Sequence, residues 1–292
     1  MGSECTLNLL VKNPLLFESL DIPDLCDRAM RTVTFTVSKG GVGKSLITAN
    51  VGAALAQKGK KVILIEGDPN HPLQLILGLE VPSKGLMLDD VIKRDLRVEK
   101  AVYATSLDNL FLAPSGVSLQ SYFDIDPIRF ADKITDLEAD LVLVDTPFPL
   151  GKAAFLSLGI CEYFVPILTE DEFVLCVESA IDTIRLGKYY LKCIPIGFIL
   201  NRIKTNEKFT GSFVKDLEDL LEIRCLARIG EDPKVSKSYG GAGSGKAFLA
   251  YQKLRESEFA DKMGEIATSL LSELPKTEKK DVTRLLKEII RQ

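Results

Sequence analysis

One short segment constrains the fold of this chain more than any other. A mostly β-branched run that contains no charged residue, Thr32–Val37, leads into the residues SKGGVGKS at 38–45, and a helical pattern begins at once with Leu46. Glycines allow consecutive backbone N–H groups to converge on an anion, and the positive end of the following helix dipole adds to the attraction. The order strand, glycine-rich turn, lysine, hydroxyl and helix therefore predicts a phosphate-binding loop.

Short apolar runs of the same kind recur along the chain, each followed by a helical pattern. The predicted strands are Thr32–Val37, Lys61–Glu66, Asn109–Ala113, Asp140–Asp145, Tyr163–Thr169, Pro195–Asn201 and Arg224–Ile229. Runs without polar alternation are typical of parallel strands that helices cover on both faces, joined by right-handed crossovers. We therefore expect an α/β fold, with a doubly wound and mostly parallel sheet flanked by helices.

Two of the predicted helices show clear apolar periodicity, Leu46–Lys58 and Phe259–Leu274. In the second, one face carries Phe259, Met263, Ile266, Ala267, Leu270 and Leu274. A stripe of this kind at helical spacing indicates packing against a core, and not a cofactor site.

Composition fits an ordinary globular protein, because 46% of the 292 residues are hydrophobic and 27% are charged. The net charge of -4 provides no overall basic field for nucleic acid, although a local basic patch stays open. No run approaches the ~20 apolar residues that cross a bilayer. The six cysteines form no C-x-x-C pair, so we expect reduced thiols in a cytoplasmic protein.

The chain contains no Gly-, Ser- or Pro-rich linker in its middle and no internal repeat, which favours one domain at residues 32–274. Residues 1–31 form an extension of unassigned role, whose first six residues match the loose myristoylation pattern by what we take to be chance. Residues 275–292 carry six basic and three acidic residues around an apolar face, which predicts a basic amphipathic helix.

Within the phosphate-binding loop, Lys44 is expected at the β- and γ-phosphates, and the Ser45 hydroxyl at Mg²⁺. The residues expected to bind the nucleotide phosphates are Gly40, Gly41, Val42, Gly43, Lys44, Ser45 and Leu46. In the common G-x-x-x-x-G-K-[ST] loop the first glycine would fall at position 38, where this chain has serine, and an additional lysine, Lys39, follows it. This K-G-G-x-G-K-[ST] pattern resembles the deviant Walker A motif of the ParA/MinD family of P-loop ATPases. The resemblance implies that Lys39 crosses a dimer interface to the partner's phosphates.

Two acidic segments resemble the switch regions of the same family. Glu66-Gly67-Asp68-Pro69 follows a predicted strand where the family usually has D-x-D-P, so Asp68 is implied to orient the attacking water and to lie near the metal. Glu66 replaces the usual aspartate, which leaves the geometry of this first switch open. Asp145-Thr146-Pro147 resembles the Walker B segment, and Asp145 is an expected outer-shell partner of Mg²⁺.

The nucleotide base has weaker sequence signals. Asn201-Arg202 resembles the N-R pair in which the asparagine amide is implied to read adenine, as its donor and acceptor allow. Glu231-Asp232-Pro233 resembles the loop that covers the base, with Gly230 where proline is usual.

Two further features are not assigned to the site. Gly240–Lys246 has the spacing of a second phosphate-binding loop but lacks the hydroxyl and the preceding strand, so we predict a plain loop. His71 is the only histidine, and the sequence assigns it no role.

The resemblance implies a Mg-ATP-dependent ATPase that forms a homodimer and acts as a positioning or partitioning switch with an activating protein partner. The surface that such a dimer binds is open between membrane, through the tail at 275–292, and non-specific DNA. One alternative is a metal-cofactor maturation ATPase of the nitrogenase iron protein class, which needs paired thiolates. Another is a nucleotide-binding regulator with little turnover, which the unusual Glu66 favours.

Overall fold

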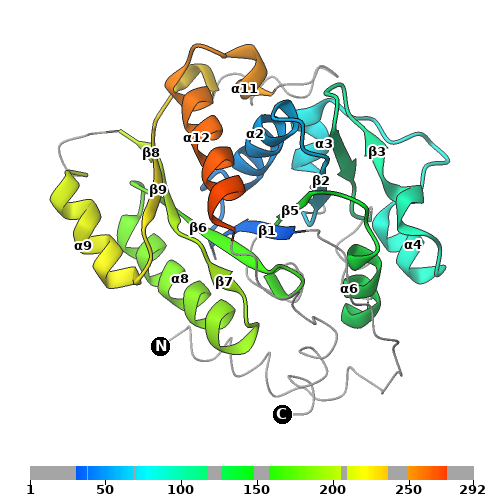
Figure 1. Ribbon diagram of the computed structural model, residues 1–292, viewed down its shortest axis with the longest axis horizontal. Coiled ribbons are helices and arrows are strands. Elements are labelled where there is room, and N and C mark those ends of the chain that lie inside the picture. Colours follow the sequence, from blue (N-terminus) through cyan, green and yellow to red (C-terminus); the bar gives the residue numbers. More distant parts are fainter. Residues whose placement is uncertain are drawn as a thin grey trace.

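The computed structural model describes residues 31–37, 39–68, 70–116, 126–147, 158–204, 209–235 and 249–274 (Figure 1). The predictions for the extension before Arg31, for the loop at 240–246 and for the amphipathic tail lie outside the described residues.

The strands form one mostly parallel sheet, which confirms the predicted fold class. The strands are β1 (Arg31–Thr36), β2 (Val62–Glu66), β3 (Tyr103–Ala104), β4 (Leu110–Ala113), β5 (Leu141–Asp145), β6 (Tyr163–Thr169), β7 (Ile194–Pro195), β8 (Phe198–Ile203) and β9 (Cys225–Gly230). Their order is β3-β4-β2-β5-β1-β6-β8-β9, with β7 paired to β6, and only the β3–β4 pairing is antiparallel.

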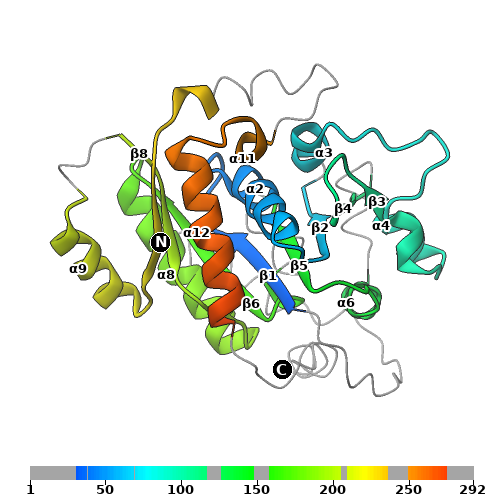
Figure 2. The ribbon, with the colours of Figure 1, turned by 45° about the horizontal axis from the view of Figure 1, so that its top comes forward.

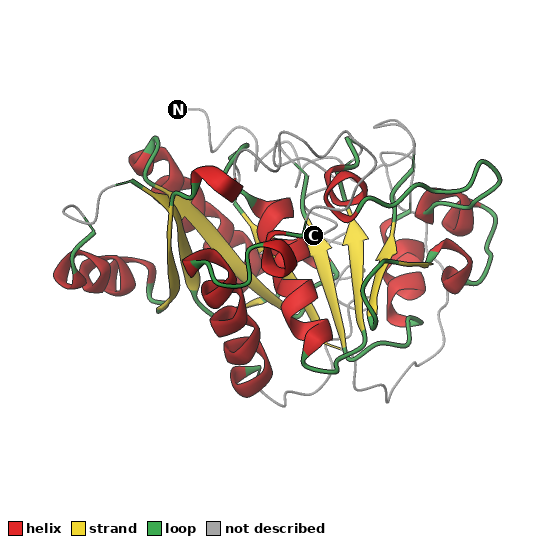
Figure 3. Cartoon of the chain, turned by 90° about the horizontal axis from the view of Figure 1, so that it is seen from above, coloured by secondary structure: helices red, strands yellow, loops and turns green. Residues whose placement is uncertain are grey.

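Helices flank both faces of this sheet (Figure 3). They are α2 (Lys44–Gln57), α3 (Pro72–Leu77), α4 (Leu88–Lys93), α6 (Pro127–Thr135), α8 (Phe173–Arg185), α9 (Gly211–Leu221), α11 (Ala250–Lys253) and α12 (Glu258–Glu273), with a 3₁₀ turn at Val98–Ala101 and a π-helical turn, η3, at Leu186–Tyr190. Figures 1 and 2 show α2 and α12 side by side over the middle of the sheet.

The first helix departs from its predicted amphipathic pattern. Helix α2 is buried nearly all round, because it lies between the sheet and the helices α3, α11 and α12. Gly52 allows this close approach, since a Cβ there would lie 2.7 Å from Leu64 Cδ2 on β2. The helix that carries the phosphate loop is therefore part of the core.

The periodic face of α12 is confirmed as a packing face. Phe259, Met263, Ile266, Ala267 and Leu270 are buried, and Leu274 packs half-buried against the core. Packing of this face on α2 and β9 fixes the helix beside the phosphate loop.

The predicted strand Pro195–Asn201 is divided into two strands. Gly197 separates β7 from β8 with a φ of 149°, and a Cβ there would lie 2.6 Å from the Leu226 side chain. The break lets β7 and β8 both pair with β6, and β8 carries Asn201 to the carboxyl edge of the sheet.

Candidate nucleotide site

The loop between β1 and α2 has the backbone that its sequence predicts. Gly41 and Gly43 have φ values of 74° and 96°, a left-handed conformation that glycine adopts without steric cost. Gly43 is the N-cap of α2, and its carbonyl accepts the first hydrogen bond of the helix from Ile47 N at 2.9 Å. The first turn of α2 thus lies against the loop, and its N–H groups have no acceptor within the helix itself.

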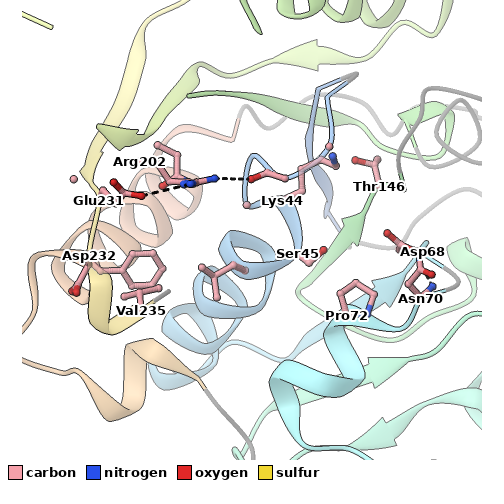
Figure 4. A pocket seen from close by; sticks show the side chains of 17 residues that line it. Lys44, Ser45, Asp68, Asn70, Pro72, Thr146, Arg202, Glu231, Asp232 and Val235 are labelled. Atoms are coloured by element: carbon pink, nitrogen blue, oxygen red, sulfur yellow. Dashed lines mark hydrogen bonds and ion pairs between the residues drawn. The ribbon is translucent and has the colours of Figure 1, made fainter. Parts of the chain in front are cut away.

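A cavity of about 510 Å³ opens at this carboxyl edge of the sheet (Figure 4). Predicted site residues that line it are Gly40, Gly41, Gly43, Lys44, Ser45, Leu46, Asp68, Asn201, Arg202, Glu231 and Asp232. Asn70, Pro72, Thr146, Gly230, Val235 and Phe259 also line it, and the sequence did not single them out as ligands. Four predicted residues are not among those that line it: Lys39, Val42, Asp145 and Pro233. Parts of the chain far apart in sequence therefore meet around one pocket.

Lys44 lies at the phosphate end of the pocket. Lys44 is only 7% exposed, and its Nζ donates a hydrogen bond of 2.8 Å to the backbone carbonyl of Lys39. Burial lowers the pKa of Lys44, although the nearby carboxylates of Asp145 and Asp68 oppose this shift. A ligand that brings negative charge to this end would favour the charged form of the amine.

Asp145 is fully buried behind the loop, directly beside Glu66 in the parallel pairing of β2 and β5. Burial is the largest cause that raises the pKa of Asp145, while the neighbouring Ser45 hydroxyl and Lys44 lower it. Neither carboxylate oxygen has a hydrogen-bond partner of good geometry within the described residues. A buried carboxylate with the Ser45 hydroxyl and Asp68 close by fits a hydrated divalent cation such as Mg²⁺.

Asp68 follows β2 and lines the pocket. Its Oδ1 accepts hydrogen bonds from Asn70 N at 2.9 Å and from Asn70 Nδ2 at 2.8 Å. Its other oxygen, Oδ2, is not used by these two bonds. The side chain is thus held in place by its own turn while part of its carboxylate stays available to the pocket.

Glu66 does not line the pocket, and its carboxylate is bound at the start of α3. Its Oε1 accepts from the backbone N–H groups of Leu73 and Gln74 at 2.9 and 3.1 Å. Its Oε2 accepts from Gln74 Nε2 at 2.7 Å and from His71 Nδ1 at 3.0 Å. The carboxylate therefore holds the first turn of α3, and the longer glutamate reaches this turn from the end of β2.

His71 has a structural role that the sequence did not reveal. It precedes α3 with a left-handed φ of 55°, and the hydrogen bond to Glu66 is the main cause that raises its pKa. The sequence signal for this contact was Glu66, five positions before His71, but such a spacing alone does not predict a hydrogen bond.

The base end of the pocket is built from β8, β9 and α12. Asn201 Nδ2 donates to the backbone carbonyl of Val42 at 2.8 Å, so one amide hydrogen ties β8 to the phosphate loop. Arg202 has a left-handed φ of 57° where the β8–β9 register shifts. Its guanidinium donates to Gly41 O at 3.3 Å and pairs with Glu231 at 3.5 Å (Figure 4). The prediction that Asn201 reads adenine stays a prediction.

Two apolar side chains at this end were not predicted as site residues. Val235 follows the loop after β9, and Phe259 belongs to the core-facing stripe of α12. Phe259 packs in the core and also contributes to the wall of the pocket. Such an apolar wall suits the face of a ring system.

The four cysteines that the structure describes are free thiols. Cys161, Cys176 and Cys193 are buried, and Cys225 is partly buried with its pKa raised to about 11, mainly by burial. In the part of the chain that the structure describes, no three His, Cys, Asp or Glu side chains gather as metal ligands. The same part contains no helix of sufficient length and apolarity to span a bilayer.

Comparisons with known proteins agree with this geometry. The CobQ/CobB/MinD/ParA nucleotide binding domain family matches residues 33–242. The chain belongs to this family. The resemblance to ParA/MinD proteins that the loop predicted is thereby confirmed.

Relatives cover most of the chain. An uncharacterised ATP-binding protein of Methanocaldococcus jannaschii is 32% identical over 89% of this chain and 95% of its own length. The septum site-determining protein MinD of Helicobacter pylori is 29% identical over 76% of this chain and 88% of its own length. The MinD structure from Pyrococcus horikoshii, solved with Mg-ADP, has a TM-score of 0.68 and 26% identity, covering 84% of this chain and 97% of that one.

Proposed function

We propose that this family member is a Mg-ATP-dependent ATPase that dimerises with ATP bound and acts as a positioning or partitioning switch. The observation that carries the proposal is the arrangement at the phosphate end, where the buried Lys44 and Asp145 side chains lie beside a glycine loop at a helix N-terminus. An ATP-binding relative and a MinD structure with Mg-ADP support the choice of ligand.

The residues divide the work of binding and hydrolysis between them. The backbone of residues 40–46 and the Lys44 amine bind the phosphates, while Ser45 and Asp145 hold Mg²⁺, which when bound neutralises phosphate charge. Asp68 orients the attacking water as a general base or positioning group. At the other end, Asn201, Arg202 and the segment Glu231–Pro233 enclose the base.

Dimerisation would couple ATP binding and hydrolysis to a change of assembly state, which is what makes the protein a switch. Lys39 crosses to the partner's phosphates, ATP closes a face-to-face homodimer, and hydrolysis disperses it. A protein partner is expected, since a MinD of Aquifex aeolicus, 25% identical to this chain, has been solved in complex with MinC. We expect such a partner to activate hydrolysis. Membrane and non-specific DNA remain the two candidate surfaces, with the tail at 275–292 as the candidate membrane anchor.

Light scattering with and without Mg-ATP tests the proposal. The wild type should double its mass with Mg-ATP, and Lys39→Ala should stay monomeric although it binds the nucleotide. If both proteins stay monomeric under saturating ATP, or both dimerise alike, the role of Lys39 is wrong. Asp68→Ala should lower hydrolysis by about 100-fold or more, in the range of a lost general base, while ATP still drives dimerisation.

The orientation of Glu66 supports a second candidate, a nucleotide-binding regulator with little turnover. Its carboxylate is used by α3 and is not directed at the pocket. Phosphate release by the wild type discriminates between the two functions. Turnover no faster than that of Asp68→Ala, with intact dimerisation, would favour the regulator.

A further inference from the structure

Lys39 is bound within its own subunit by a short acidic turn. This acidic turn is Glu170–Asp171–Glu172, which joins β6 to α8. The Lys39 Nζ donates to the backbone carbonyl of Asp171 at 2.9 Å and pairs with Glu172 Oε2 at 2.9 Å. Only 20% of the Lys39 side chain is exposed in this arrangement.

The backbone of Glu172 directs its carboxylate toward Lys39. Glu172 is the N-cap residue of α8, a position where the shorter side chains of Ser, Thr, Asp or Asn ordinarily accept from the first N–H groups of the helix. Here the residue has a left-handed conformation, φ 51° and ψ 44°, and its side chain makes no capping bond. The carboxylate is 63% exposed and pairs with the lysine instead.

The acidic turn is held in place from the end of β8. Asp171 accepts from Lys204 Nζ at 2.7 Å and lies 3.6 Å from the Arg202 guanidinium. The hydrogen bond from Lys204 is the main cause that lowers the pKa of Asp171. The backbone N–H of Lys204 also donates to Glu170 Oε2 at 2.6 Å. These contacts join the acidic turn to the base end of the pocket, since Arg202 also pairs with Glu231.

We propose that the acidic turn is a latch that retains Lys39 in cis and opposes dimerisation until a triphosphate competes for the lysine. The proposal rests on the proposed function, because Lys39 matters as a latch only if it acts in trans. The Lys39 amine already directs two of its three N–H donors to the acidic turn, so a partner's phosphates must compete with Glu172 for its charge. A pair this exposed is weak, so the latch sets a threshold and does not block closure.

Glu172→Gln tests the latch, because glutamine keeps the size of the side chain and removes its charge. Amine-reactive labelling of the nucleotide-free protein, read by mass spectrometry, should show Lys39 labelled about threefold faster in the variant, relative to the exposed Lys58. The dimer dissociation constant in saturating Mg-ATP should fall about fivefold, since two latches open in each dimer. Asp219→Asn, which removes an exposed charge from α9, is the matched control and should change neither quantity.

The outcomes separate the latch from the proposed function. If wild type and Glu172→Gln both dimerise with equal constants, or the variant dimerises more weakly, the latch is wrong and the proposed function stands. Unchanged labelling of Lys39 also overturns the latch. If neither protein dimerises although both bind Mg-ATP, the proposed function is wrong. Dimerisation by the variant alone would support the latch in a stronger form.

Discussion

The two ends of the pocket differ in how their charges are satisfied. At the phosphate end, Asp145 is buried without a hydrogen-bond partner in the described chain, and Lys44 bonds a carbonyl of its own loop. At the base end, Arg202 pairs with Glu231 and Asp171 at the protein surface. The phosphate end therefore gains most from a charged ligand, whereas a ligand at the base end must exchange existing partners.

This difference indicates where binding free energy arises. Charges in a desolvated site interact strongly with a ligand, because water screens them little. Half-exposed ion pairs contribute ~1 kcal/mol or less. We expect substitutions at the phosphate end to affect nucleotide affinity by much larger factors than substitutions at the base end, and three binding measurements test this.

Lys44→Ala should have the largest effect, a loss of Mg-ATP affinity of about 100-fold or more, since it removes a buried charge-assisted bond to phosphate. Isothermal titration calorimetry measures it, with Lys58→Ala on the exposed end of α2 as the control. A loss below about threefold, with a normal melting curve, would break the contrast between the two ends.

Asp145→Asn should come next, because asparagine keeps the shape and loses the charge that a cation needs. Mg²⁺ should strengthen ATP binding to the wild type about 10- to 100-fold more than binding to the variant, as loss of a metal-orienting partner does. Titrations with and without EDTA give both values. Equal enhancement by Mg²⁺ in the two proteins would show that Asp145 does not serve the metal.

Glu231→Gln should weaken Mg-ATP binding only about two- to fivefold, because the carboxylate is already paired with Arg202 in a half-exposed position. The same calorimetric titration compares it directly with Lys44→Ala. A loss as large as that of Lys44→Ala would mean that the base end provides as much affinity as the phosphate end.

His71 should give the smallest effect, on stability alone. Its folded pKa is raised, so the stability from its bond to Glu66 is fully present below the unfolded value of about 6.5 and is lost as pH rises through the folded value. Urea unfolding of wild type and His71→Gln at pH 5.5 and 8.5 should show a wild-type advantage larger by ~0.5 kcal/mol at the lower pH. An advantage that grows with pH would contradict this. Asp145, whose pKa is also raised, is present in both proteins, so its contribution to the pH dependence cancels when their unfolding free energies are subtracted.

The sequence predicts the phosphate end well, because its parts follow from one rule. Parallel strands end at the same edge, so the residues after β1, β2 and β5 had to meet there. The loop, Asp68 and Asp145 lie together as expected, and Glu66 and Asp145 are register partners. Backbone geometry is enough to bring these groups together.

The rest depends on side-chain conformation and on long-range packing, which no motif encodes. The bond from Glu66 to α3 depends on one extra methylene group, and the left-handed Arg202 depends on a shift of strand register. The apolar periodicity of α12 predicts that Phe259 belongs to the core, but its position at the start of the helix also places it in the wall of the pocket. The pairing of Lys39 with Glu172 joins segments whose strands are neighbours only in the folded sheet.

Gly43 and Asn201 are linked sterically. A Cβ at residue 43 would lie 2.6 Å from Asn201 Nδ2, although the two residues are far apart in the sequence. The same Nδ2 donates to the carbonyl of Val42, 159 positions away. An alanine at 43 would need a shorter residue at 201, and even that double exchange would leave an unfavourable left-handed backbone. Under the proposed function, redesign of this pocket for a different base would therefore have to treat both positions as one unit, because a change at Asn201 would also alter the glycine loop.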